Sequence, residues 1–402
     1  MTRTELDIAA TIASVADDLV VDTDAFVTTI KRRHRRRRRR QLAVAGGATL
    51  VVALGVGVPA ALLGPLGSGG PVAAPTGGAT TTARVFAGTC TVEKIAAPLD
   101  VQPGLPIGVT AMDPTGRYIA GTYGPPPTYG EVTASVGGQP VLWDNGVGRV
   151  LPVGGEHVNF VHVSSVNRHG WVVGTSSTDL GESSVAWISR DATSWEVLPM
   201  PAGYESARAA AINDRGDVVG TVFGGSSSDL VVWSPDDEGG WTTRVIDTMT
   251  WTTTLAIDDD GTVTAFVTGR QPHLWHSDGT RTSPPQLDHL PWVNPIQVRG
   301  DWAVATTAVP VGDSPVPTDT VLLRWNIRTG ETDLIDGPVE SIWLGATVNG
   351  RGDVAWVGTL RTHDGHEYAL PDPPGARAVY PPVVISEDAT LIASLDGSVW
   401  RC

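Results

Sequence analysis

A short pattern recurs seven times along this chain and limits what it can fold into. Its clearest copy is "AINDRGDVVGT" (211–221), in which two runs of mostly apolar residues flank a polar turn that contains glycine. This pattern predicts a β-hairpin, because Asn213 can open a type I turn and Gly216 can supply the left-handed position that closes it. The chain is therefore expected to be built from hairpins and not from helices.

The other six copies align with this one on the turn glycine. They are "AMDPTGRYIAGT" (111–122), "SVNRHGWVVGT" (165–175), "AIDDDGTVTAF" (256–266), "IQVRGDWAVAT" (296–306), "TVNGRGDVAWVGT" (347–359) and "VISEDATLIAS" (384–394). In the last copy, Ala389 stands where glycine is expected. The 47 glycines and 30 prolines among 402 residues suit many short strands joined by turns.

Each copy is followed by a second mark, a short strand that ends in or contains an aromatic residue. These strands are "PVLW" (140–143), "SVAW" (184–187), "LVVW" (230–233), "PHLW" (272–275), "LLRW" (322–325), "HEYAL" (366–370) and "SVW" (398–400). The first five tryptophans are 44, 46, 42 and 50 residues apart, and such periods are typical of propeller blades or solenoid coils. Together with fourth strands such as "TTRVI" (242–246), they predict an all-β, seven-bladed propeller of four-stranded blades over residues 85–402.

The two ends of the predicted propeller complement each other. The seventh unit lacks a fourth strand, whereas "CTVEKIAAPL" (90–99) has the fourth-strand pattern and precedes the first hairpin. Pairing these ends would close the ring without an exposed edge. Cys90 and Cys402, the only cysteines, would then lie on neighbouring strands. An oxidising compartment would allow a disulfide between them; two free thiols are the alternative.

The first 84 residues are organised differently. Residues 1–40 form an acidic tail that ends in "KRRHRRRRRR" (31–40), and residues 41–63 are apolar and uncharged. A cleaved signal peptide would have a shorter basic region and a shorter apolar core. The arginine run alone could bind nucleic acid. The favoured interpretation is a single transmembrane helix over 41–63, which the adjacent positive charge holds with its N-terminus in the cytoplasm.

The region beyond this span is expected to lie outside the cell. Residues 64–84 are a flexible linker rich in glycine, proline and threonine. Beyond Gln41 the chain has 18 basic and 37 acidic residues, a net charge of −19. Such an acidic domain repels phosphate backbones, so no nucleic acid is expected as its partner. The cell membrane, with the C-terminal domain extracellular, is the predicted location.

The repeats resemble a known family. "AINDRGDVVGT" followed by "LVVW", and "SVNRHGWVVGT" followed by "SVAW", are similar to the HAF-type repeats of bacterial envelope proteins. "PHLWHSDG" stands where that family has its His-Ala-Phe tripeptide, although only the histidine is retained. The resemblance covers roughly residues 85–402 and implies a secreted propeller-like domain with no assigned chemistry. The tail, polyarginine and span resemble those of actinobacterial membrane proteins, some of which regulate sigma factors.

The sequence favours a binding module over an enzyme. It contains no nucleophile elbow and no phosphate-binding glycine loop. The histidines of "HDGH" (363–366) lack the further ligands of a metal site, so no metal and no cofactor is expected. Two alternatives stay open. One is a transmembrane regulator whose residues 1–30 bind a sigma factor or a similar partner, and the other is a hydrolase or lyase that acts on envelope glycans.

Aromatic residues provide the candidate binding site. One is expected just before the first strand of each of six units: Phe160, Tyr204, Trp251, Trp292, Trp343 and Tyr380. On the face with the longest loops they could form a ring that holds an extracellular glycan, peptide or protein. Packing between blades is the alternative role for these six rings.

Overall fold

The described strands of the computed structural model pair into seven antiparallel sheets of four strands each. The structure describes residues 89–402 except 100, 103, 125–137, 154–159, 178–183, 226, 250–251, 268–271, 286, 288–289, 291–292, 311–316, 336–344 and 374–381. Six sheets consist of four consecutive strands, and the seventh combines the first strand with the last three. Each sheet is called a blade below.

The first four blades follow the chain from residue 107. Blade 1 contains β2 (Ile107–Met112), β3 (Tyr118–Tyr123), β4 (Gln139–Asp144) and β5 (Val147–Val150). Blade 2 contains β6 (Phe160–Val166), β7 (Val172–Ser177), β8 (Ser184–Ser189) and β9 (Glu196–Val197). Blade 3 contains β10 (Ser206–Ile212), β11 (Val218–Gly224), β12 (Ser227–Pro235) and β13 (Trp241–Met249). Blade 4 contains β14 (Thr252–Ile257), β15 (Val263–Val267), β16 (His273–Trp275) and β17 (Arg281–Thr282).

The remaining three blades complete the series. Blade 5 contains β18 (Val293–Arg299), β19 (Trp302–Pro310), β20 (Pro317–Asn326) and β21 (Thr332–Ile335). Blade 6 contains β22 (Ala346–Val348), β23 (Val354–Trp356), β24 (Thr359–Arg361) and β25 (Glu367–Ala369). Blade 7 contains β26 (Pro382–Ile385), β27 (Leu391–Ser394), β28 (Ser398–Arg401) and β1 (Thr91–Lys94).

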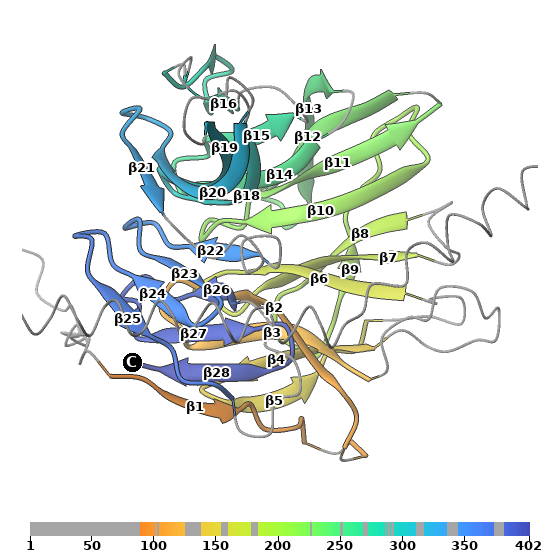
Figure 1. Ribbon diagram of the computed structural model, residues 1–402. Helices are drawn as coiled ribbons and strands as arrows, with labels where there is room; N and C mark the ends of the chain where they lie inside the picture. The colour runs from red at the N-terminus through yellow and green to blue at the C-terminus, as the bar shows by residue number, and fades with distance from the viewer. Residues whose placement is uncertain are drawn as a thin grey trace, which may run out of the picture. The chain divides into compact units, whose positions relative to one another are not determined.

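The first strand of every blade lies at the centre of a ring. β2 contacts β6, β6 contacts β10, and the series continues through β14, β18, β22 and β26 back to β2 (Figure 1). Sheets that radiate from such a ring form a β-propeller. The predicted seven-bladed propeller of four-stranded blades is confirmed.

The turn that motivated this prediction has the expected geometry. The Gly216 amide donates to the Asn213 carbonyl at 3.1 Å, and Gly216 has a φ of +89°. Ala389, in the copy without glycine, has a φ of +58°, a conformation that costs a non-glycine residue free energy. The turn position thus keeps its left-handed geometry even where the sequence departs from glycine.

A close backbone contact beside a β-bulge explains a second glycine of the repeat, the one in "VVGT". In blade 3 the register between β10 and β11 shifts between Ala209 and Ala211. A Cβ atom on Gly220 would lie 2.0 Å from the carbonyl oxygen of Arg208 on β10. The equivalent Gly121 and Gly174 are equally crowded, with carbonyl oxygens at 1.9 and 2.2 Å. The close approach of these carbonyl oxygens therefore requires glycine at this position in blades 1, 2 and 3.

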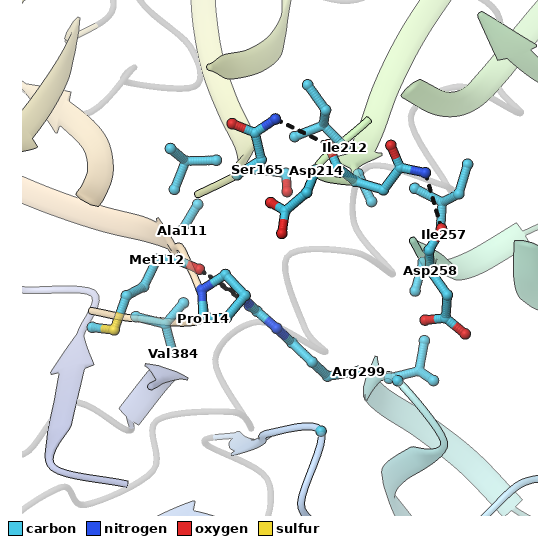
Figure 2. Close-up of a pocket in the computed structure, with 18 of the residues that line it drawn as sticks. Ala111, Met112, Pro114, Ser165, Ile212, Asp214, Ile257, Asp258, Arg299 and Val384 are labelled. Carbon is cyan, nitrogen blue, oxygen red and sulfur yellow. Dashed lines mark hydrogen bonds between the residues drawn. The ribbon is translucent and has the colours of Figure 1, made fainter. Parts of the chain in front are cut away.

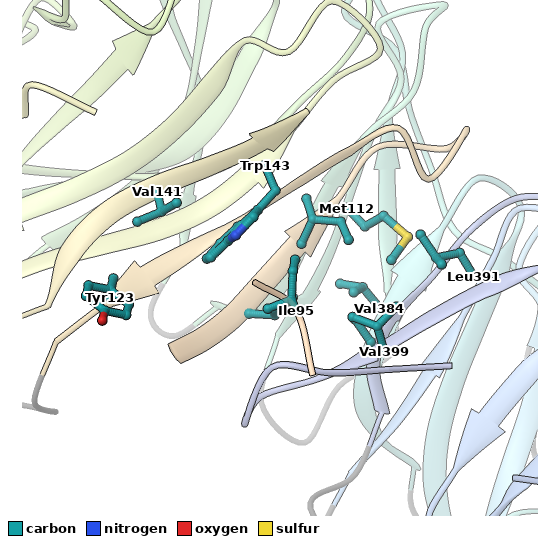
Figure 3. Close-up of a cluster of buried hydrophobic side chains, with 11 residues drawn as sticks. Ile95, Met112, Tyr123, Val141, Trp143, Val384, Leu391 and Val399 are labelled. Atoms are coloured by element: carbon teal, nitrogen blue, oxygen red, sulfur yellow. The ribbon is translucent and has the colours of Figure 1, made fainter. Parts of the chain in front are cut away.

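The hydrophobic core is divided among the interfaces between neighbouring blades and does not form a single cluster. Seven clusters of buried side chains each join residues of two neighbouring blades. The third-strand tryptophans belong to them, as Trp143 shows in the cluster between blades 7 and 1 (Figure 3). Its indole nitrogen donates to the Ala96 carbonyl at 2.8 Å, and Trp233 donates likewise to Pro199. Trp143 and Trp233 therefore attach their blades to the segment that follows the preceding blade's outer strand.

Blade 7 closes the ring as predicted. β1 pairs with β28 in antiparallel register, with Thr91 opposite Arg401 and Lys94 opposite Ser398. A disulfide joins Cys90 to Cys402, which are 312 residues apart in the sequence. The N-terminal strand of the propeller thus completes the blade formed by its last three strands.

One strand assignment made from the sequence is wrong. Segment 366–370 was expected to be the third strand of its unit, but β25 is the fourth, and it pairs with β24. A tight turn with Gly358 at a φ of +73° brings β24 directly after β23. Arg361 on β24, which pairs with Val354 as Trp233 pairs with Val218 in blade 3, occupies the place of the tryptophan in this blade. Without an aromatic side chain there, the third strand carried no mark in the sequence.

The expected tail (1–40), transmembrane helix (41–63) and linker (64–84) lie outside the described residues. Within the part of the chain that the structure describes, no helix is long and apolar enough to span a membrane.

Candidate functional site

A cavity of about 480 Å³ opens at the centre of the ring (Figure 2). All seven blades contribute to it through the ends of their first strands and the turns that follow. The walls along the strands are made of small side chains, among them Ala111, Ser165, Ala211 and Ala256. Small residues at the crowded centre leave this space open, and its volume falls in the range of small-molecule sites.

Asparagines of the turns connect neighbouring blades around this opening. The Asn167 side-chain nitrogen donates to the Asn213 carbonyl, and the Asn213 nitrogen donates to the Asp258 carbonyl, both at 2.9 Å. In blade 6, the Asn349 nitrogen donates to Ser386 of blade 7 at 3.0 Å. Each asparagine oxygen meanwhile accepts amides of its own turn. One side chain thus closes its own hairpin and binds the next blade.

Carboxylates at the mouth are held by a second set of bonds between blades. Asp214 accepts the Arg168 amide and Asp259 accepts the Asp214 amide, both at 2.9 Å. Glu387 accepts the Gly350 amide at 3.0 Å. Asp214 also forms an ion pair with the Arg168 guanidinium at 3.1 Å. The acidic side chains at the rim are therefore fixed in position by the fold.

Arg299 crosses the cavity. Both terminal nitrogens of its guanidinium donate to the Met112 carbonyl oxygen, each at 3.1 Å. Arg299 belongs to blade 5 and Met112 to blade 1, so the side chain spans the opening, as Figure 2 shows. Burial in the cavity lowers the pKa of Arg299, while the nearby carboxylates of Glu387 and Asp113 oppose this effect.

An acidic cluster lies where blades 4 and 5 meet. The Arg328 guanidinium donates to Asp301 and, at 3.2 Å, to Asp258. The pKa of Asp258 is raised to about 6, mainly by burial and in addition by the negative charges of Asp260 and Asp301. The nearby Arg328 guanidinium acts in the opposite direction. The lining of the cavity contains two arginines, Arg168 and Arg299. It contains five carboxylates, those of Asp214, Asp258, Asp259, Asp301 and Glu387. The cavity is therefore polar and mostly acidic.

The six aromatic residues predicted as the binding site do not line this cavity among the described residues. Phe160 begins β6 and is partly buried. Tyr204 packs against the core between blades 2 and 3, and its hydroxyl donates to Asp229, which raises the pKa of Tyr204. The other four, Trp251, Trp292, Trp343 and Tyr380, lie outside the described residues. The aromatic site therefore stays a prediction.

The histidines of the "HDGH" segment pair with single carboxylates. His363 lies 3.1 Å from Asp353, and His366 lies 3.1 Å from Asp364. Across the described parts of the chain, no three residues of the metal-binding types gather in one place.

The sequence did not reveal the cavity residues, because acids in such turns already have a local role in capping the turn. Asp113 does cap its own turn, accepting the Thr115 and Tyr118 amides. Asp258, Asp259 and Asp301, however, also face the central opening. One signal was available: in "IQVRGDWAVAT" the turn is shortened, and Arg299 stands where the other copies have asparagine, aspartate or serine.

No family model matches the chain, and no curated protein is similar to it in sequence. Its fold is similar to that of oligogalacturonate lyase from Vibrio parahaemolyticus, with a TM-score of 0.50 and 12% identity over 78% of this chain and 97% of the lyase. Virginiamycin B lyase from Staphylococcus aureus gives a TM-score of 0.44 and 12% identity over 78% of this chain and 99% of the lyase. YCF48 from Cyanidioschyzon merolae gives a TM-score of 0.43 and 12% identity over 77% of this chain and 98% of YCF48. At such identities the likeness concerns the fold alone, and the HAF-type resemblance stays a prediction.

Proposed function

We propose that the propeller is a binding module whose ligand enters the central cavity on the face of the first-strand turns. The observation that carries this proposal is Arg299, a guanidinium that lies inside a cavity of about 480 Å³ and is held by a backbone carbonyl. A positioned cation surrounded by fixed carboxylates offers both donors and acceptors to a small polar molecule. Apolar ligands are disfavoured, because they would bury these charged groups without offering them hydrogen bonds.

Filling the cavity tests this function. Ser165 lines the wall in blade 2, and Ser165→Phe should abolish binding of polar metabolites in ligand-detected NMR of the full chain. Thr193→Phe, at an exposed turn of the same blade, is the matched control and should bind like the unaltered protein. Equal binding by both variants would refute the cavity as the site.

The location of the module is part of the proposal. The uncharged segment 41–63 behind nine positive charges supports a single membrane span with the propeller outside the cell. Protease added to intact cells should digest the propeller and spare an epitope at residue 2. Digestion of the epitope with survival of the propeller would reverse the proposed orientation.

An enzyme acting on envelope glycans is the second candidate. Asp258 favours it, because a carboxyl in a cavity with its pKa raised to about 6 is suited to proton transfer near neutral pH. Asp258→Asn should then abolish turnover of cell-wall fragments. Turnover that persists at the original rate would exclude Asp258 as the acid or base.

A further inference from the structure

The side chain of Arg299 is not needed by its own turn. β18 and β19 are joined by Gly300 and Asp301 alone, with Arg299 paired directly to Trp302. Arg299 occupies the register position of Asn213, whose oxygen accepts the amides of Arg215 and Asp217 in the longer turn of blade 3. The two-residue turn of blade 5 has no such amides to satisfy, so the fold leaves this side chain free for another role.

The guanidinium of Arg299 lies in the cavity without a counterion. Among the described residues it forms no ion pair, and both terminal nitrogens share one neutral acceptor. Its acidic neighbours have other partners: Asp214 pairs with Arg168, Asp113 caps its turn, and Glu387 accepts the Gly350 amide. A half-buried cation without an anionic partner is unfavourable, and a planar guanidinium suits a bidentate carboxylate. The Met112 carbonyl thus occupies donors that a carboxylate would bind more strongly.

The side of the cavity away from Met112 is acidic. Blade 4 presents Asp258 and Asp259, and blade 5 presents Asp301. Arg328 pairs with Asp258 and Asp301, whereas Asp259 accepts one backbone amide and, within the described residues, no cation. Figure 2 shows the Asp258 carboxylate across the open space from the Arg299 guanidinium. Excess negative charge in a cleft raises the local concentration of cations.

We propose that the ligand of this cavity is a basic amino acid, with its carboxylate on Arg299 and its ammonium groups on the acidic side formed by blades 4 and 5. This inference rests on the proposed binding function and names its ligand class. A sugar is less well matched, because none of the described residues that line the cavity is aromatic and could stack on its ring. The excess of carboxylates over arginines selects a ligand with more ammonium than carboxylate groups.

Three probes test the two contacts separately by titration calorimetry of the full chain. L-Lysine carries all the charged groups, cadaverine lacks the carboxylate, and Nα,Nε-diacetyl-lysine lacks both ammonium groups. L-Lysine should bind at least about tenfold more tightly than either of the others, since each lost charge contact is worth at least about 1.4 kcal/mol. Cadaverine binding as tightly as L-lysine to the unaltered protein would overturn the carboxylate contact.

Variants assign the contacts to residues. Arg299→Gln should remove the preference for L-lysine over cadaverine, whereas Asp259→Asn should weaken the binding of both. Retained preference for L-lysine in Arg299→Gln would overturn the role of Arg299. If neutral metabolites bind in the cavity and none of the three probes does, the proposed function stands and the basic amino acid is refuted. If Ser165→Phe alters no binding at all, the proposed function itself fails.

Discussion

A comparison of blades 3 and 5 shows the structural role of the repeated residues and the effect of replacing them. In blade 3, Asn213 closes its turn and reaches blade 4, and Gly220 makes room for the Arg208 carbonyl of β10. In blade 5 the turn has two residues, Arg299 replaces the asparagine, and Ala305 replaces the glycine. The repeated asparagine thus attaches neighbouring blades, and the repeated glycine allows close strand contact within a blade. Blade 5 has neither, and its residue at the asparagine position crosses the cavity.

The largest expected effect concerns the glycine opposite the bulge. In Gly220→Ala, the new methyl group would lie 2.0 Å from the Arg208 carbonyl and 2.8 Å from the Trp233 ring. We expect a loss of at least about 4 kcal/mol in the free energy of unfolding, measured by urea denaturation. The reciprocal change, Ala305→Gly in blade 5, should cost only about 1–2 kcal/mol. Equal losses would show that the two blades do not differ at this position.

A smaller difference in stability between the two blades is expected at the first residue of the turn. Asn213 is 4% exposed and takes part in hydrogen bonds to its own turn and to Asp258. Asn213→Ala leaves these buried groups without partners and should cost about 3 kcal/mol. Arg299→Gln, at the same position of blade 5, should change stability by less than about 1 kcal/mol. A large loss in the arginine variant would mean that its contact with Met112 supports the fold.

The smallest effect depends on pH and lies at Asp258, which occupies the asparagine position in blade 4. Its pKa is raised from 3.8 to about 6 in the folded protein, so the folded state binds the proton more tightly. Stability from this group is complete below pH 3.8 and is lost as the pH rises through about 6. The cost at pH 7 is up to about 3 kcal/mol, for a side chain that is 21% exposed.

Asp258→Asn should therefore stabilise the protein by about 2 kcal/mol at pH 7, and the gain should shrink as the pH falls toward 4. Thermal unfolding at pH 7, 5.5 and 4 measures this trend. A destabilised variant at pH 7 would show that the ion pair with Arg328 outweighs the burial of the charge.

The hairpins and the ring closure could be predicted because their determinants lie in short segments. Asn213 and Gly216 stand three residues apart, and β1 was recognised from its pattern and from Cys90. The cavity could not be predicted in this way. Arg299 and Met112 are 187 residues apart and meet only once the ring exists. The role of Asp258 likewise depends on Arg328, which comes from another blade. Contacts across the ring depend on which side chains face each other once all seven blades are in place, and no short segment of the sequence encodes this.

The closure of blade 7 also sets the order in which the molecule can be completed. β1 is among the first described residues to be synthesised, yet its only strand partner among them, β28, lies about 300 residues later. Blades 1 to 6 can form from consecutive strands while the chain is still emerging, because their contacts are local. β1 meanwhile has an open edge, which is a site of aggregation. A chaperone that binds extended segments would therefore be needed most at β1, and release from it would coincide with the arrival of β28.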